Sequence, residues 1–445
     1  MRNLKNENKT MFLVIIIAAA FALCLCLCLF AVLGLGYFWM ADTNSEFSSP
    51  VDPPQDINQQ MDLIQSQTAE LRGLSPTSEI TRTLINTDQL RQNVTADFLS
   101  EYSAEEARED ALILSAFGLL EPDFDLFDPY MELYTEQIAG YYDNETKEMF
   151  VVQESGFQGP ERLTYAHEYA HVLQDQAYDI QNGLQYDDES CKEDSERCLA
   201  IQALLEGDAS LTEIQWFQKY ATKTDHSQIL EYSSDSQSPV YDSAPAFLKE
   251  DFLFPYTSGY AFVEYLYDHG GWDAVNQAYA GVPVSSEQIL HPESYPSDIP
   301  LEVSLPDFAP VLGADWQELD RGVMGEWYTF LILAYGSDPN SRVEKEKAQT
   351  AAAGWGGDAY SVYRRLSDDS LVMSLVLEWD TVQEAQEFEQ VFLTYLNNRF
   401  GQQSGGLWQT PGELHRFERL GSRTTWLMAP DMSVLNGLWD ALSSP

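Results

Sequence analysis

The chain of 445 residues has few basic side chains, with 24 Lys and Arg residues against 71 Asp and Glu residues and a formal net charge of −47. Such a surface repels the phosphates of nucleic acids and of anionic lipids, so we expect no nucleic-acid partner. Hydrophobic residues nevertheless make up 44% of the chain and aromatic residues 13%. This composition excludes an acidic disordered tail and predicts a folded protein with a sizeable core.

Cysteine is scarce, with five residues in the whole chain. Cys24, Cys26 and Cys28 lie in an apolar run, where we interpret them as small hydrophobic side chains. Cys191 and Cys198 lie in an acidic segment, and we expect them to form one disulfide if that segment faces an oxidising compartment. A metal site on this pair is disfavoured, because the usual zinc-binding spacing is about two to four intervening residues and six lie between them.

Charged residues are absent from Met11 to Met40, a run of 30 residues that follows a basic segment at 1–10. This run is longer than the roughly 20 residues that span a bilayer, so it predicts an uncleaved transmembrane signal anchor. The basic segment is expected to stay in the cytoplasm, which places everything after residue 40 outside the cytoplasm, beginning with a Pro-rich linker at 41–60. We therefore expect a single-pass protein of the cell membrane, with the membrane contacted through this helix.

Two of the six histidines fall in one motif. The run from Leu163 to Ala177 contains no Gly or Pro and predicts a helix, on which His167 and His171 share one face. This spacing lets two imidazoles bind one metal ion. Glu168 lies about 100° further round the helix, where a base can take a proton from a metal-bound water. The alternative is two surface histidines beside an acid, with no metal.

A catalytic zinc keeps three protein ligands and one open position for water. A third histidine on the same helix is excluded, because the positions three and six residues after His171 hold Gln174 and Ala177. The best candidate is Glu206, on the apolar turn ALLEGDA of a second expected helix at Cys198–Tyr220, where a lone carboxylate would be costly. The alternative for Glu206 is a salt bridge to a buried arginine.

With the motifs HEYAH and ALLEGDA, the segment 138–267 resembles the gluzincin group of zinc metallopeptidases. The resemblance implies that His167, His171 and Glu206 are zinc ligands and that Glu168 is the general base. The wider layout of the chain also resembles uncharacterised membrane-anchored bacterial proteins, a likeness that implies no particular substrate.

The resemblance also suggests residues that support the site. It implies a supporting role for Asp175, four residues after the second histidine. Where thermolysin-like enzymes place an Asp four residues after the ligand Glu, this chain has Ser210, and Asp208 is the alternative for that part. Tyr and His donors stabilise the oxyanion in such enzymes. The candidates here are Tyr256, Tyr260 and His291, with Tyr256 and His291 favoured, although each taken singly also suits a core or turn position.

The segment 138–152 predicts a β-hairpin, with aromatic and β-branched arms around Asp143 and Asn144. A strand just before the motif helix could pair with an extended peptide substrate by edge addition. An ordinary structural hairpin is the alternative.

Hydrophobic spacing predicts an α+β fold that is mostly helical before residue 336. The resemblance to gluzincins implies that residues 61–335 form a zincin-like catalytic domain. The segment 336–445 is predicted to form a small α+β module with the pattern strand–strand–helix occurring twice. We interpret the chain as a membrane-anchored extracytoplasmic zinc metallopeptidase, an endopeptidase acting on a peptide or protein substrate. The alternative is a non-catalytic interaction protein on a zincin scaffold, which would have no need for Glu168 as a base.

Overall fold

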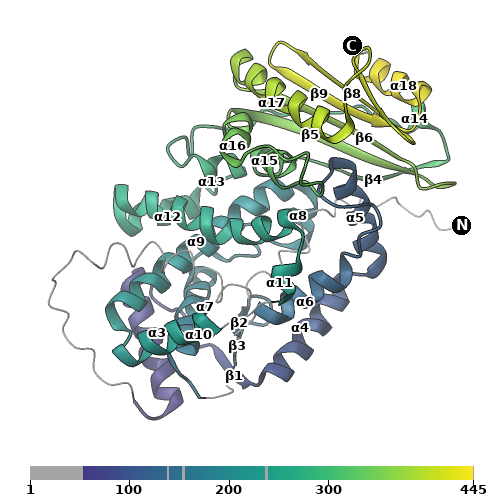
Figure 1. Cartoon of the computed structure of the whole chain (residues 1–445). Coiled ribbons are helices and arrows are strands. Elements are labelled where there is room, and N and C mark those ends of the chain that lie inside the picture. The colour runs from purple at the N-terminus through teal and green to yellow at the C-terminus, as the bar shows by residue number, and fades with distance from the viewer. Residues whose placement is uncertain (1–53, 138–139, 153–155, 236–238, 444–445) are drawn as a thin grey trace, which may run out of the picture.

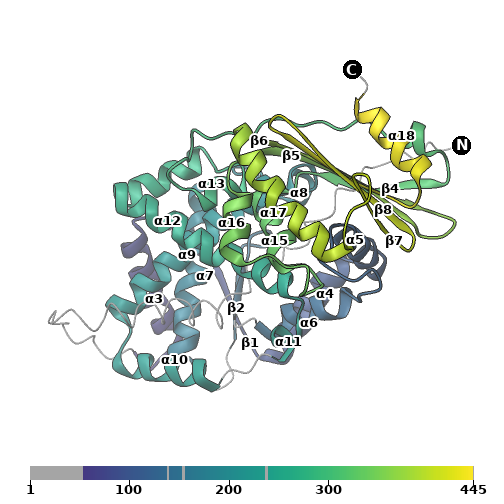
Figure 2. The same ribbon diagram turned by 45° about the horizontal axis from the view of Figure 1, so that its top comes forward.

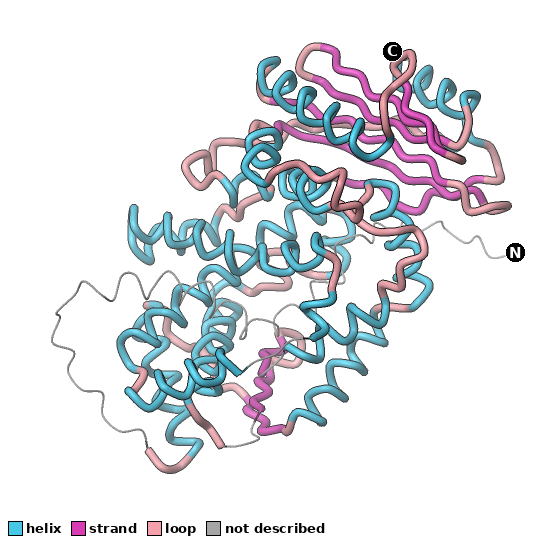
Figure 3. The backbone as a smooth tube through the Cα atoms, viewed as in Figure 1, coloured by secondary structure: helices cyan, strands magenta, loops and turns pink. Residues whose placement is uncertain are grey.

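The computed structural model describes residues 54–137, 140–152, 156–235 and 239–443. These residues form an α+β protein in which helices predominate and the strands lie in two separate sheets (Figures 1 and 3). The strands are β1 (Thr81–Ile85), β2 (Gly140–Asp143), β3 (Glu148–Val152), β4 (Trp316–Gly322), β5 (Trp355–Arg365), β6 (Leu371–Trp379), β7 (Leu407–Thr410), β8 (Glu413–Leu420) and β9 (Arg423–Ala429).

The helices run from one end of the described chain to the other. Those before residue 300 are α3 (Ile57–Arg72), α4 (Thr87–Glu101), α5 (Ala104–Phe117), α6 (Phe127–Gln137), α7 (Gly159–Tyr178), α8 (Asp188–Glu193), α9 (Ser195–Tyr220), α10 (Lys223–Asp235), α11 (Pro239–Ser243), α12 (Ala246–Ala280) and α13 (Ser286–Leu290). Those after it are α14 (Ala309–Leu312), α15 (Gly325–Tyr335), α16 (Lys345–Ala352), α17 (Val382–Phe400) and α18 (Met432–Ser443).

The prediction of a single-pass membrane protein, and with it the expected cell-membrane location, is wrong by the structure. Within the described ranges, no helix combines the length and the apolar character that crossing a bilayer requires. The physical reason is that the long helices carry charges along their length, as α9 does with Glu196, Glu206 and Lys219. The run at 11–40, which motivated the prediction, lies outside the described residues.

The smaller sheet has the strand order β1–β3–β2. Strands β2 and β3 form the expected antiparallel hairpin, with Gly140 opposite Val151, so the prediction of a hairpin is confirmed over residues 140–152. Strand β1 joins the other side of β3 in parallel, with Thr81 opposite Glu148. Strand β2 is therefore the outer strand of this sheet on the side away from β1.

Two long helices form the centre of the helical part (Figures 1 and 2). Helix α7 contains the segment 163–177, and its second residue, Pro160, occupies the first turn, where a missing N–H costs nothing. Helix α9 contains the expected second helix at 198–220 and packs against α7 on one side and α12 on the other. Helix α12 is interrupted at Gly271, whose backbone is not helical.

The six-stranded sheet has the order β4–β5–β6–β9–β8–β7, and every neighbouring pair is antiparallel. It contains the expected pattern twice, as β5–β6–α17 and β8–β9–α18. Helix α17 covers one face, where Phe392 packs against Trp426, and α18 covers the other, where Leu435 belongs to a cluster with Leu427. The first face shares one hydrophobic cluster with the helices of the central part, so the two regions are packed together.

The expected disulfide between Cys191 and Cys198 is present, and both residues are completely buried. The bond ties the short helix α8 to the first turn of α9. It therefore fixes the start of the helix that carries Glu206.

Candidate metal centre

Three side chains converge between α7 and α9. The Nε2 atom of His167 lies 3.2 Å from Glu206 Oε2, and that of His171 lies 3.5 Å from the same oxygen. The two Nε2 atoms are 3.2 Å apart. The two histidines occupy successive turns of α7, and Glu206 lies in the middle of α9. The three ligand atoms all lie within 4.8 Å of one another, and all three side chains are buried.

This group of atoms suits a cation. Burial by itself raises the pKa of Glu206, but the imidazoles of His171 and His167 outweigh burial and lower it. Burial lowers the pKa of His167, but its hydrogen bonds to Glu206 and Glu213 outweigh burial and raise it well above its usual value. Glu206 and Glu213 therefore favour a positive charge at His167. Two imidazole nitrogens and one carboxylate oxygen are also a common ligand set of catalytic zinc.

The far nitrogens of both imidazoles have acceptors of their own. The Nδ1 atom of His167 lies 3.0 Å from Glu213 Oε2, and that of His171 lies 2.9 Å from Gln174 Oε1. The Gln174 amide donates in turn to the Leu205 carbonyl, at 3.0 Å. Because Nδ1 donates in each ring, Nε2 is the nitrogen left to bind a metal. The sequence reasoning missed Glu213, although it lies seven residues after Glu206, two turns along the same face of α9.

Glu168 lies on α7 beside the converging group and is directed at the smaller sheet. Its Oε2 atom accepts a hydrogen bond from the backbone N–H of Tyr142 in β2, at 3.0 Å. Burial raises the pKa of Glu168 well above its usual value, and this exceeds the opposing effect of His167. A carboxylate with a raised pKa is suited to exchanging protons near neutral pH.

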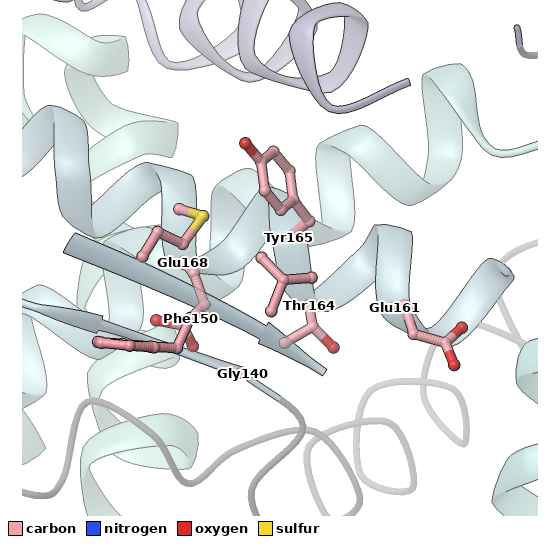
Figure 4. A pocket seen from close by; sticks show the side chains of 8 residues that line it. Gly140, Phe150, Glu161, Thr164, Tyr165 and Glu168 are labelled. Carbon is pink, nitrogen blue, oxygen red and sulfur yellow. The ribbon is translucent and has the colours of Figure 1, made fainter. Parts of the chain in front are cut away.

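A narrow pocket lies beside Glu168 (Figure 4). Thr164, Tyr165 and Glu168 of α7 line one side, and Gly140 and Phe150 of the hairpin line the other. Glu168 is the one predicted site residue among those that line it. The pocket therefore lies between Glu168, the expected general base, and the β2–β3 hairpin.

Asp175 holds the hairpin onto α7 and does not bond to an imidazole in the described contacts. Its carboxylate accepts hydrogen bonds from the Tyr142 hydroxyl and from Lys147 Nζ, each at 2.7 Å. Both partners belong to the β2–β3 hairpin and its turn. Asp175 thus positions the strand whose N–H bonds to Glu168.

Asp208 takes part in a buried ion pair. Its Oδ1 atom accepts from Arg72 Nε at 2.6 Å, and its Oδ2 atom accepts from the Tyr279 hydroxyl at 2.7 Å. The alternative considered for Glu206 was a salt bridge to a buried arginine. A buried arginine, Arg72, is present, but it pairs with Asp208. Asp208 was also considered as a residue that supports the metal ligands. In the structure Glu213 has this position, because its carboxylate lies beside Nδ1 of His167.

Gly207 lies where helices α9 and α12 cross. A Cβ atom on Gly207 would lie 2.1 Å from the Gly259 carbonyl oxygen, and one on Gly259 would lie 2.1 Å from the Ala203 carbonyl oxygen. The two helix backbones therefore touch next to Glu206. This contact explains a glycine in the interior of a long helix, where propensity alone disfavours it.

The expected oxyanion donors lie in three different settings. Tyr256 is buried on α12, one turn before Gly259. The Tyr260 hydroxyl donates to Glu264, one turn further on the same helix. His291 Nε2 lies 3.0 Å from Glu326 Oε1, at the start of α15. Among the described His, Cys, Asp and Glu side chains, His291 does not belong to the group of converging ligands.

One family model matches the chain, over residues 313–439, and its description is a domain of unknown function (DUF8575). This range holds the six-stranded sheet and lies outside the converging histidines and Glu206. No curated protein and no solved structure matches the chain.

Proposed function

We propose that this chain is a zinc-dependent peptidase whose metal is held by His167, His171 and Glu206. The observation that carries the proposal is the convergence of these three ligand atoms, with Glu168 on the adjacent position of α7. A bound zinc ion would supply Lewis-acid activation of water. Glu168 accepts the proton at its carboxylate and returns it to the leaving amine of the cleaved peptide bond.

The outer edge of β2 is the proposed place for the substrate backbone. It is one of the two outer edges of the smaller sheet in the described residues, and its Tyr142 N–H bonds to Glu168. A peptide that adds to this edge as another strand would present its carbonyl groups beside Glu168. Edge addition recognises the backbone, so it favours extended peptides over a particular side chain.

A second candidate follows from burial. His167 and Glu168 are each 4% exposed, Glu206 is 1% exposed and His171 is completely buried. This degree of burial favours a closed metal site in a non-catalytic binding protein, where zinc stabilises the contact between α7 and α9. The two candidates share their ligands and differ in whether Glu168 has a chemical task.

Two substitutions distinguish these candidates. Glu206→Ala removes a ligand, so the purified full chain is expected to lose its zinc, measured as metal per chain after dialysis. Glu168→Gln leaves the three ligands in place, so we expect about one zinc per chain but at least a hundredfold slower cleavage of a peptide library. Glu189→Gln is the matched control, since it makes the same change at an exposed position on α8 and should keep both properties.

Each outcome selects one reading. Zinc retained in Glu206→Ala would place the third ligand elsewhere. Zinc in the wild type without cleavage of any library peptide would favour the closed, non-catalytic site. Equal cleavage by wild type and Glu168→Gln would remove Glu168 as the base.

A further inference from the structure

A second group of acidic side chains lies far along the chain from the candidate zinc ligands. Glu287 in α13, Asp298 in the segment after it and Asp380 directly after β6 each direct a carboxylate oxygen to one point, with the oxygens within 4.8 Å of one another. None of the three forms an ion pair with a Lys, Arg or His in the described part of the chain. Three carboxyl groups thus meet without a basic side chain beside them.

The most buried member of this group has an unsatisfied oxygen. Glu287 is 3% exposed, and its Oε2 atom has no hydrogen-bond partner among the described residues. Burial, together with the nearby carboxylates of Glu326, Asp298 and Asp380, raises the pKa of Glu287 to about 9. Burying a carboxylate in this way is costly unless a positive group accompanies it.

The imidazole of His291, four residues after Glu287, does not form an ion pair with it. His291 Nε2 bonds to Glu326 Oε1 at 3.0 Å, and Glu326 Oε2 is itself buried and unpaired among the described residues. The surroundings of Glu287 therefore add negative charge.

We propose that Glu287, Asp298 and Asp380 form a second cation site, selective for a hard divalent ion such as Ca²⁺. All the donors are carboxylate oxygens, which Ca²⁺ prefers, and no nitrogen or sulfur donor of the kind that favours zinc belongs to the group. Asp298 and Asp380 are the more exposed members, which leaves a side open to solvent for bound waters. This site does not depend on the proposed peptidase activity.

The position of the site gives it a structural task. Glu287 and Asp298 precede the region matched by the family model, whereas Asp380 lies inside it, on the connection from β6 to α17. Close by, Leu301 N donates to the Gly356 carbonyl at 2.6 Å, so the segment after α13 already touches the start of β5. A cation here would link the helical part to the six-stranded sheet.

Calcium binding by the full chain tests this proposal. The protein is freed of metals on a chelating resin, reloaded with one equivalent of zinc and titrated with CaCl₂, with calorimetry and thermal unfolding as readouts. We expect about one Ca²⁺ per chain and a Tm that rises with its concentration. Asp380→Asn should weaken binding at least tenfold, whereas Asp273→Asn, an exposed Asp on α12, should leave it unchanged.

A second variant guards against a misfolded protein. Glu287→Gln replaces an ionisable group that the folded protein must bury, so without calcium its Tm should exceed that of the wild type, yet it should no longer respond to Ca²⁺. The response of Glu206→Ala should equal that of the wild type, which separates this site from the zinc site. Absence of calcium binding, equal binding by Asp380→Asn and Asp273→Asn, or a response to Mg²⁺ alone would overturn the proposal.

Discussion

At the scale of single residues, the candidate zinc site depends on side chains that do not bind the metal. Glu213 holds Nδ1 of His167, and Gln174 links Nδ1 of His171 to the backbone of α9 at Leu205. Such partners fix both the ring orientation and the position of the proton. The site therefore extends at least two turns along α9 beyond Glu206.

The contribution of Glu213 can be measured. Glu213→Gln keeps the size of the side chain and removes the charge that supports His167, so we expect zinc affinity to fall by roughly tenfold to a hundredfold. Competition with a chromogenic chelator measures this change. Glu189→Gln, an exposed position on α8, is the control and should bind as the wild type does. Equal affinity in both variants would limit the site to its three ligands.

A buried carboxylate away from the metal sites makes stability depend on pH. Asp251 accepts hydrogen bonds from Trp327 Nε1 and the Tyr328 hydroxyl, both at 2.8 Å, and burial raises its pKa to about 6. Between its usual pKa, 3.8, and about 6, the folded protein keeps this proton and the unfolded chain releases it. Since the folded state then binds more protons, this group lowers the free energy of unfolding as the pH rises through that window.

Asp251→Asn should remove this dependence, because the amide keeps an acceptor for Trp327 and does not titrate. We expect the wild type to lose on the order of 2–3 kcal/mol relative to the variant between pH 4 and pH 7. Urea denaturation of both proteins at the two pH values measures the difference. A difference that stays constant with pH would show that Asp251 titrates alike in both states.

At the scale of elements, the contact between α9 and α12 sets the position of Glu206. The crossing depends on Gly207 and Gly259, where the two backbones touch, and on the neighbouring ion pair between Asp208 and Arg72. The sequence Glu-Gly-Asp in α9 therefore combines a candidate metal ligand, a close helix contact and an anchor for α3.

Gly207→Ala tests the crossing. Alanine favours a helix over glycine by about 1 kcal/mol, so an isolated helix would gain stability. Here the added Cβ would lie 2.1 Å from the Gly259 carbonyl oxygen, so we expect a lower free energy of unfolding and weaker zinc binding. Gly281→Ala is the control, because no atom lies within 4 Å of the Cβ it would add. A stabilised Gly207→Ala protein would show that the helices separate at little cost.

At the scale of the whole molecule, two regions share one hydrophobic cluster that runs from the helical part into one face of the six-stranded sheet. The folded chain also concentrates a formal net charge of −47. Repulsion between like charges is weaker in the expanded unfolded chain, so it opposes the compact state.

This repulsion predicts that salt stabilises the protein. Raising NaCl from about 0.02 M to about 0.5 M shortens the range of charge interactions severalfold, so Tm should rise. Differential scanning calorimetry at constant pH, on protein freed of divalent ions, measures the effect. A Tm that falls with NaCl would mean that attractive ion pairs outweigh the net repulsion.

The sequence by itself determined those helices and strands that are specified by residues close together along the chain. The helix around His167 and His171, the hairpin after Gly140 and the repeated strand–strand–helix pattern all follow from periodicity and from Gly and Pro positions. The pairing of Cys191 with Cys198 was also accessible, because only a short segment separates them. Helix spacing alone likewise brings two imidazoles to one side of α7.

Contacts between distant segments were decided by the tertiary structure. The Arg72 partner of Asp208 lies 136 residues away, and β1 pairs in parallel with β3 although helices α4, α5 and α6 separate the two strands in the sequence. The prediction of a membrane-spanning protein came from one apolar run and failed against the described helices. A sequence records which side chains can bond, whereas the packing of α9 between α7 and α12 selects which of them meet, because each contact depends on two surfaces at once.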